Sequence, residues 1–153
     1  MKVLPELTIS PPDTIAANAF SLPQGIIGFA DYSRAELLYM PDHLPFLWLK
    51  LSGPVGSVSF VVIEPGGIVP GYELEIFDND AESLDITDPT EVMVLNVVTV
   101  QRQSPLHATI NLVGPIVVNR RTRVGRQVVI ANYSRYSARH ALVEAQDARL
   151  ATA

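Results

Sequence analysis

Runs of apolar residues separated by proline and glycine dominate the pattern of this chain. The strongest runs are rich in β-branched and aromatic residues, as expected of strands that are buried on one or both faces. They lie at 46–51, 58–63, 92–100, 116–119 and 127–130. From His107 to Val113 apolar and polar residues alternate, so this segment predicts a half-buried strand.

Weaker signals predict shorter strands and a few helical turns. The shorter candidate strands lie at 4–9, 16–22, 35–40 and 72–76. One helical turn is expected at 31–34 with Asp31 as its cap, and another at 79–84 with Asn79 or Asp80 as its cap. Residues 138–151 contain neither Gly nor Pro and favour a final helix.

Turn residues recur along the chain at the intervals of an antiparallel barrel or sandwich. The 153 residues include 12 prolines and 9 glycines, which punctuate the apolar runs. A chain of this length can bury one hydrophobic core. The pattern therefore predicts one all-β, mainly antiparallel domain with one or two short helices.

Composition limits the compartment and the chemistry. The chain has 48% hydrophobic residues, 18% charged residues and a net charge of −5, which favours a folded domain over a disordered one. Cysteine is absent, so disulfides and cysteine nucleophiles are excluded. Glu6 and the Pro11-Pro12 pair interrupt the N-terminal region before a signal peptide forms. No apolar run approaches the ~20 residues of a membrane span, so we expect a cytoplasmic protein.

Charge is divided along the sequence. Between residues 64 and 91 there are nine of the 16 acids and no Lys or Arg. From 102 to 139 every charged residue is an arginine. The acidic block is either a solvated face that maintains solubility or a surface that attracts a basic partner.

The arginines gather between two predicted strands. Arg120, Arg121, Arg123 and Arg126 are therefore expected at a hairpin tip, either paired with the acidic block or in contact with nucleic-acid phosphates. The negative net charge and the lack of aromatic residues at the tip favour the first alternative. Tyr136 and Arg139 follow the last strong strand in a polar segment, and both residue types are enriched at protein interfaces.

The motifs of catalytic and metal sites are missing from the sequence. His43, His107 and His140 lie far apart, without the spacing of a helical metal site. The pair Gly66-Gly67 lacks the later Gly-Lys-Ser/Thr of a phosphate-binding loop, and no Gly-x-Ser-x-Gly element is present. We therefore predict no catalytic residue, no metal and no cofactor.

Several segments occur in an order that resembles one known family. The N-terminal piece, LPQGIIGFADY at 22–32, is followed by matching pieces further along the chain. They lie at 45–49, 60–65, 70–76, 88–99, 109–119, 127–129 and 136–140. Together these pieces resemble the flagellar assembly factor FliW family over about residues 20–142, whereas Gly66-Gly67 and 10–18 depart from its pattern.

The resemblance implies a fold and a function. It implies a small β-barrel-like domain at 1–142. The tail at 143–153 lies beyond this domain and is a candidate helix on its composition alone. The resemblance implies a bacterial, cytoplasmic and non-enzymatic partner switch that is monomeric when free. Family members bind the RNA-binding translational regulator CsrA beside its RNA surface and thereby relieve repression of flagellin messenger RNA. Free flagellin competes for them, so that CsrA is released.

The resemblance also changes how the acidic block is interpreted. Because CsrA is basic, the block becomes a candidate docking face, whose attraction should weaken as salt rises. Within it we select Tyr72, Glu73, Glu75, Asp78 and Asp80, from charge and composition rather than from the family motif. Glu73 and Glu75 share one strand face, and Tyr72 is expected to anchor its edge.

Three further expectations remain. Flagellin offers apolar helical termini, so its site should contain exposed hydrophobic residues. An RNA-binding β-barrel that uses the Arg120–Arg126 tip is the first alternative function. A small-ligand-binding β-barrel, which would require a closed polar pocket with a perturbed acid, is the second.

Overall fold

The structure, a computed structural model, describes residues 1–5, 18–101 and 107–142 of the chain. Within these ranges strands dominate, and α1 (Asp78–Ser83) is the α-helix. The strands are β1 (Lys2–Val3), β2 (Ala19–Ser21), β3 (Arg34–Leu38), β4 (Leu47–Gly53), β5 (Gly56–Ile63), β6 (Leu74–Glu75), β7 (Val92–Gln101), β8 (His107–Ile110), β9 (Ile116–Asn119), β10 (Val124–Gln127) and β11 (His140–Ala141). Short 3-10 helices are η2 (Pro41–His43), η3 (Pro89–Glu91) and η4 (Tyr133–Arg135).

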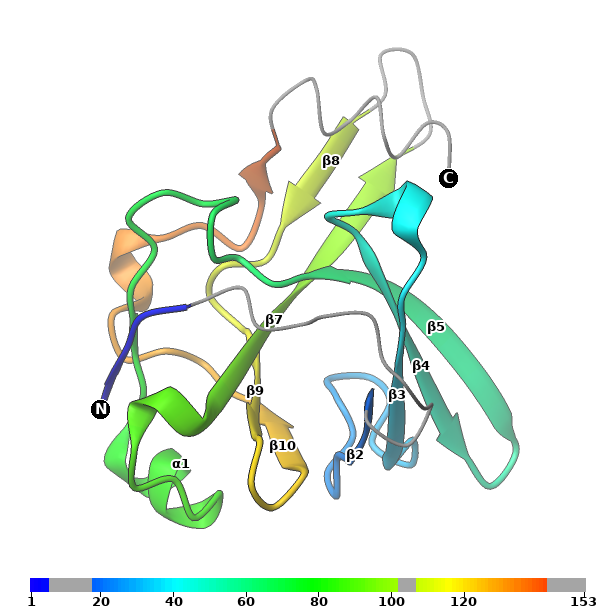
Figure 1. The fold of residues 1–153 in the computed structure, drawn as a ribbon, viewed down its shortest axis with the longest axis horizontal. Coiled ribbons are helices and arrows are strands. Elements are labelled where there is room, and N and C mark those ends of the chain that lie inside the picture. The colour runs from blue at the N-terminus through cyan, green and yellow to red at the C-terminus, as the bar shows by residue number, and fades with distance from the viewer. Residues whose placement is uncertain (6–17, 102–106, 143–153) are drawn as a thin grey trace.

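Seven of the strands close into a barrel (Figure 1). Around the barrel their order is β7, β5, β4, β3, β2, β10 and β9, and β9 pairs again with β7. The pairings are antiparallel except that between β2 and β10, which is parallel and rests on Ser21 opposite Val124. The predicted all-β, mainly antiparallel, barrel-like fold is confirmed.

The N-terminal half of β7 is buried on both of its faces. Met93 and Leu95 belong to the apolar cluster inside the barrel, whereas Val92 and Val94 belong to a second cluster outside it. This explains why the run lacks alternation of apolar and polar residues. The C-terminal half of β7 extends past the barrel wall and pairs with β8, which pairs in turn with β11.

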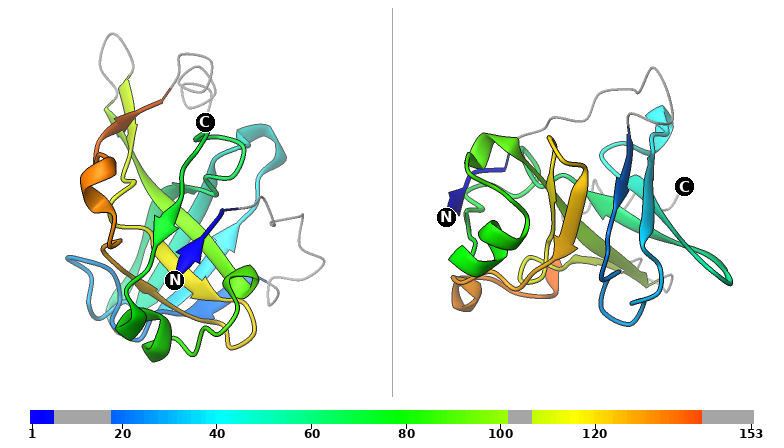
Figure 2. Two further views of the ribbon diagram at one scale, coloured as in Figure 1. Left: turned by 90° about the vertical axis from the view of Figure 1, so that its left-hand side faces the viewer. Right: turned by 90° about the horizontal axis from the view of Figure 1, so that it is seen from below.

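A second layer covers one side of the barrel. It contains α1, β1, β6 and their connections, and the right-hand panel of Figure 2 shows it on the side opposite β2 and β3. Val3 of β1 lies opposite Leu74 of β6, and both are buried with Ala81 and Leu84 of the α1 region. Burial of a large apolar side chain stabilises a fold by about 1.5–3 kcal/mol, so packing holds this layer against the barrel.

The main apolar runs form the expected strands. Those at 46–51, 58–63, 92–100 and 116–119 correspond to β4, β5, β7 and β9. The alternation from 107 to 113 is confirmed by burial, because Ala108, Ile110 and Leu112 are buried while the residues between them are partly exposed. The shorter candidates at 16–22 and 72–76 contain β2 and β6, and the candidate at 35–40 overlaps β3, which begins one residue earlier at Arg34.

The prediction at 127–130 is wrong in its boundaries. β10 ends at Gln127, although the Val128 and Ile130 amides still donate to the carbonyls of Pro115 and Val113. Proline has no N–H to donate in return, so the regular ladder stops there. Residues 6–9 of the candidate strand at 4–9 lie outside the described residues, and β1 precedes this candidate at Lys2–Val3. The predicted helix at 138–151 lies outside the described residues beyond residue 142, and β11 lies where it was expected to begin.

The helical turn predicted at 31–34 is also wrong. The chain makes tight turns over 23–31, and Arg34 already begins β3 because the Leu22 amide donates to the Ser33 carbonyl. The second predicted helix is confirmed as α1, but its N-cap is Phe77 rather than Asn79 or Asp80. No side chain caps this helix end.

Candidate functional site

The predicted acidic face is built around β6. Segment 71–76 pairs with β1 along one edge and is held along the other by Asn132. The Asn132 side chain accepts from the Glu75 amide at 2.9 Å and donates to the Glu73 carbonyl at 2.9 Å. One amide side chain thus replaces a strand partner, which fixes the backbone that carries both acids.

Three of the predicted acids are available at this face. Glu73 is 37% exposed and lies 3.3 Å from Lys2 Nζ. Glu75 is 47% exposed and accepts a hydrogen bond from the N-terminal ammonium at 3.4 Å, while Asp78 is fully exposed and 3.8 Å from the same ammonium. Exposed pairs of this kind contribute little to stability, so these carboxylates can exchange their partners at small cost.

Tyr72 does not anchor the edge of this face, which corrects the expectation from the sequence. It is 4% exposed; its hydroxyl donates to the Leu112 carbonyl at 2.6 Å and accepts from Asn96 Nδ2 at 3.3 Å. Burial raises the pKa of the Tyr72 hydroxyl well above its ordinary range, and the bond from Asn96 opposes that rise. Tyr72 therefore supports the face from beneath.

Asp80 is likewise turned toward the protein. Its side chain is only 14% exposed and lies 3.2 Å from Arg126 Nη1. Arg121 pairs with Asp85 at 2.9 Å and with Glu91 at 3.7 Å, and the Asp85 carboxylate raises the pKa of the Arg121 guanidinium. The prediction that the arginines pair with the acidic block is confirmed for Arg121 and Arg126.

Arg120, Arg121 and Arg123 lie at the predicted hairpin tip, whereas Arg126 lies within β10. Residues 120–123 turn between β9 and β10, and the Arg120 guanidinium donates to the Thr90 carbonyl at 3.4 Å. Buried Asn119 fixes the tip: its Nδ2 donates to the Leu84 and Asp85 carbonyls, and its Oδ1 accepts from the Arg121 amide. Arg123, with φ +60°, makes no ion pair within the described residues.

The two residues of the predicted Tyr–Arg surface have different surroundings. Tyr136 is half-buried; its hydroxyl accepts from the Glu73 amide at 3.0 Å, and its ring packs edge-on against Tyr72. Arg139 is exposed and lines a groove. Tyr136 is thus part of the support of the acidic face, and only Arg139 remains as an exposed side chain.

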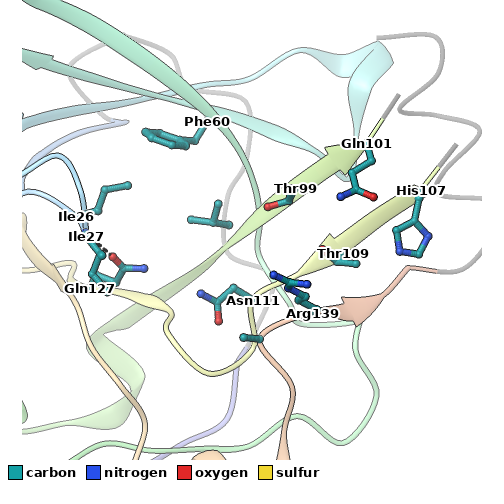
Figure 3. Close-up of a pocket in the computed structure, with 12 residues that line it drawn as sticks. Ile26, Ile27, Phe60, Thr99, Gln101, His107, Thr109, Asn111, Gln127 and Arg139 are labelled. Atoms are coloured by element: carbon teal, nitrogen blue, oxygen red, sulfur yellow. Dashed lines mark hydrogen bonds between the residues drawn. The ribbon is translucent and has the colours of Figure 1, made fainter. Parts of the chain in front are cut away.

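Figure 3 shows the side chains that line this groove, and its volume is about 560 Å³. It opens at one end of the barrel, where the arm made by β7 and β8 extends beyond the wall. Thr99 lies opposite Thr109 and Gln101 opposite His107, so their side chains share one face of the arm. Phe60, Ile26 and Ile27 form the facing apolar side.

The groove combines exposed apolar area with uncharged hydrogen-bonding groups. Ile27 is 79% exposed, and its amide donates to Gln127 Oε1 at 2.9 Å, which fixes the loop at the groove edge. No Asp or Glu lies among the described lining residues, and Arg139 supplies a positive charge. Sequence reasoning missed this site except for Arg139, since its walls come from segments scattered between residues 26 and 139. The one available signal was the exposed face of the alternating strand at 107–113.

No group of three or more His, Cys, Asp or Glu side chains is placed to hold a metal ion within 1–5, 18–101 and 107–142. No helix in those ranges is long and apolar enough to cross a membrane.

Comparisons with known proteins point to one family. The sequence matches the family model described as FliW protein over residues 4–142. A flagellar assembly factor FliW from Natranaerobius thermophilus is 33% identical over 126 residues, covering 82% of each chain. The factor of the same name from Geobacillus kaustophilus is 39% identical over 120 residues, covering 78% of this chain and 80% of that protein. A crystal structure of the flagellar assembly factor FliW matches with a TM-score of 0.70 and 31% identity, over 95% of this chain and 99% of that chain.

Proposed function

The chain belongs to the FliW family of flagellar assembly factors, and on this premise we propose that it acts in the bacterial cytoplasm as a non-enzymatic partner switch. In this role it binds and antagonises the translational regulator CsrA, and newly made flagellin captures it and frees CsrA. The observation that carries the proposal is the family match over residues 4–142, which spans every described strand from β2 to β11.

We assign CsrA to the acidic face. Glu73, Glu75 and Asp78 are exposed there, and their present partners are Lys2 and the N-terminal ammonium, which a basic protein can replace. The buried contacts of Tyr72 and Asn132 hold the backbone in place, so a partner meets preorganised carboxylates.

We assign flagellin to the groove. Flagellin presents apolar helical termini, and the groove offers Ile27, Ile26 and Phe60 on one side and Thr, Gln and Asn side chains on the other. Such a mixture suits an amphipathic segment, whose apolar residues are buried while its polar edge keeps hydrogen bonds.

A buried polar network joins the two surfaces. Tyr72, next to Glu73, donates to the Leu112 carbonyl, and Asn96 donates to the carbonyl of Asn111, which lines the groove. A segment that displaces Asn111 therefore acts on the hydrogen bonds beneath the acidic face. This contact supports release of CsrA by flagellin even though the two partners bind at different places.

The experiment is a calorimetric titration with CsrA from the same genome, repeated after saturation with flagellin. The expected result is tight CsrA binding that flagellin abolishes. The variant Glu73→Lys/Glu75→Lys should weaken CsrA binding by about tenfold or more, because attraction at the face becomes repulsion. Asp31→Lys/Asp42→Lys is the matched control, with the same charge change at exposed positions elsewhere.

Flagellin binding is tested separately at the groove. Because Ile27 is exposed, Ile27→Asp places a charge in the proposed apolar contact without disturbing the core. Flagellin binding should therefore fall by about tenfold or more. Val55→Asp is the control, since Val55 is 89% exposed on the turn between β4 and β5.

Folded protein that binds neither CsrA nor flagellin contradicts the partner switch. Direct binding to the flagellin leader RNA, lost on replacing the tip arginines, would instead favour the nucleic-acid alternative.

A further inference from the structure

A second hollow, of about 470 Å³, lies on the outside of the barrel wall away from the acidic face. It crosses β2, β3 and β4 and reaches the tip between β9 and β10. The register brings its polar residues together, because Ser21 lies opposite Arg34, and Arg34 lies opposite Ser52. Lys50 lies opposite Glu36 in the adjacent row, and Arg123 completes the hollow at the tip.

The three cations of this hollow outnumber its one acid, Glu36. Among the residues that the structure describes, Arg34, Lys50 and Arg123 make no ion pair, whereas Arg121 and Arg126 are paired with acids. In a chain of net charge −5 this is an unusual concentration of free positive charge. Such a surface attracts carboxylates or phosphates.

The surroundings favour a protein ligand over a nucleic acid. Glu36 stands among the cations and would repel a continuous phosphate backbone, but it can pair with a basic residue of a peptide. The aromatic side chain in the described lining, Phe20, is buried and cannot stack on a base. The Ser21 and Ser52 hydroxyls can donate to carboxylates as well as accept from peptide amides.

We propose that this hollow binds an acidic segment of a partner protein. Arg123 and Arg34 lie on either side of β2, and neighbouring strands are about 4.8 Å apart, so their backbones are separated by roughly 10 Å. That separation matches one turn of a polyproline II segment, about 9 Å, in which every third residue faces the same side, and this sets the spacing of the acidic residues. A basic residue between them would face Glu36. The surface is distinct from both partner surfaces assigned above, so it can be occupied at the same time as either.

The test uses a labelled synthetic peptide with glutamate at every third position, one central lysine and serine elsewhere. Binding is followed by fluorescence anisotropy and by the amide resonances of Ser21 and Ser52. The peptide should bind saturably to the full chain and shift both resonances, whereas the same peptide with glutamine in place of glutamate should not. Arg34→Gln/Lys50→Gln should weaken binding at least fivefold. Arg135→Gln, which removes a positive charge from an exposed position outside the three assigned surfaces, should not change it.

Other ligands and a second variant complete the test. Glu36→Gln should remove the preference for the lysine-containing peptide over the same peptide with glutamine in place of lysine, because it removes the acid that faces the lysine. Tighter binding of a single-stranded RNA oligonucleotide than of the peptide at these resonances would overturn the proposal in favour of nucleic acid. Displacement of the peptide by equimolar inorganic phosphate would reduce the hollow to a small-oxyanion site and also overturn it. Failure of the peptide to bind to folded protein would overturn it whatever CsrA and flagellin do.

Discussion

Tyr72 carries a hydroxyl into the apolar layer outside the barrel, and its hydrogen bonds determine whether that group is tolerated. The hydroxyl donates to the Leu112 carbonyl at 2.6 Å and accepts from Asn96 Nδ2 at 3.3 Å. A buried polar group without partners costs free energy comparable to a lost hydrogen bond. The position therefore requires tyrosine for structural support rather than for contact with a partner.

The first prediction concerns removal of this hydroxyl. Tyr72→Phe leaves the Leu112 carbonyl without this donor, so the free energy of unfolding should fall by about 1–3 kcal/mol. Urea denaturation measures the change. Tyr133→Phe is the control, because Tyr133 is 54% exposed, and it should leave the urea midpoint unchanged. Equal midpoints for Tyr72→Phe and the unaltered chain would show that the buried bonds contribute nothing.

The second prediction is a pH dependence that belongs to the same side chain. Burial raises the pKa of Tyr72 in the folded chain, whereas the unfolded chain keeps the ordinary value near 10.0. Above that pH the unfolded tyrosine releases its proton and the folded one does not, so stability is intact below about pH 10 and falls above it. The unaltered chain should lose about 1 kcal/mol more than Tyr72→Phe between pH 10 and 11. Parallel pH profiles of the two proteins would contradict this.

At the scale of elements, glycine decides the path of the loop between β2 and β3. Gly25 has φ +61°, and a side chain there would overlap the Phe29 carbonyl and lie 2.9 Å from Ala30 Cα. Gly28 has φ +87°, but no atom lies within 4 Å of where its side chain would be. This loop brings Ile26 into the barrel core and Ile27 to the groove.

The third prediction compares these two glycines. Gly28→Ala adds only the strain of a left-handed backbone, about 1 kcal/mol, whereas Gly25→Ala adds an overlap with backbone atoms as well. Gly25→Ala should therefore reduce the free energy of unfolding by about 2 kcal/mol more than Gly28→Ala. Thermal and urea unfolding of both variants measure the difference. Similar losses in the two variants would mean that the loop moves aside without cost.

At the scale of the whole molecule, charge is segregated across the barrel. The elements α1 and β6, which carry the acidic face, lie on one side of the barrel, and β2, β3 and β4 lie on the other (Figures 1 and 2). The hollow with Arg34 and Lys50 lies on β2, β3 and β4. The groove carries less charge than either surface, because its described lining residues include Arg139 and no acid. Partners of different chemistry can therefore recognise different sides of one small protein.

The fourth prediction uses this segregation. CsrA at the acidic face depends on long-range attraction, which salt screens beyond about 10 Å at 0.1 M. Raising the salt from about 50 mM to about 500 mM should weaken CsrA binding by about tenfold or more, mainly through slower association. Flagellin binding at the groove relies on apolar burial and should change by less than about threefold. Calorimetry and stopped-flow association rates at both salt concentrations test the difference; equal responses would place both partners on surfaces of the same kind.

The sequence alone determined the elements that depend on local pattern. Long apolar runs predicted β4, β5, β7 and β9, because burial of apolar side chains is favourable whichever elements cover them. The helix at α1 and the hairpin at the arginine tip followed from residues close in sequence. The helical turn predicted at 31–34 does not form, because the hydrogen bond from the Leu22 amide to the Ser33 carbonyl overrides a weak helical preference.

Tertiary structure alone decided which polar residues are available. Tyr72 and Asp80 look exposed in the sequence, yet Asn96 and Leu112 enclose the first, and Arg126 turns the second inward. The groove and the cationic hollow were also beyond sequence reasoning, because each is assembled from segments up to about a hundred residues apart. Strand pairing brings such segments together, and a residue's own pattern carries no information about which distant strand will become its neighbour.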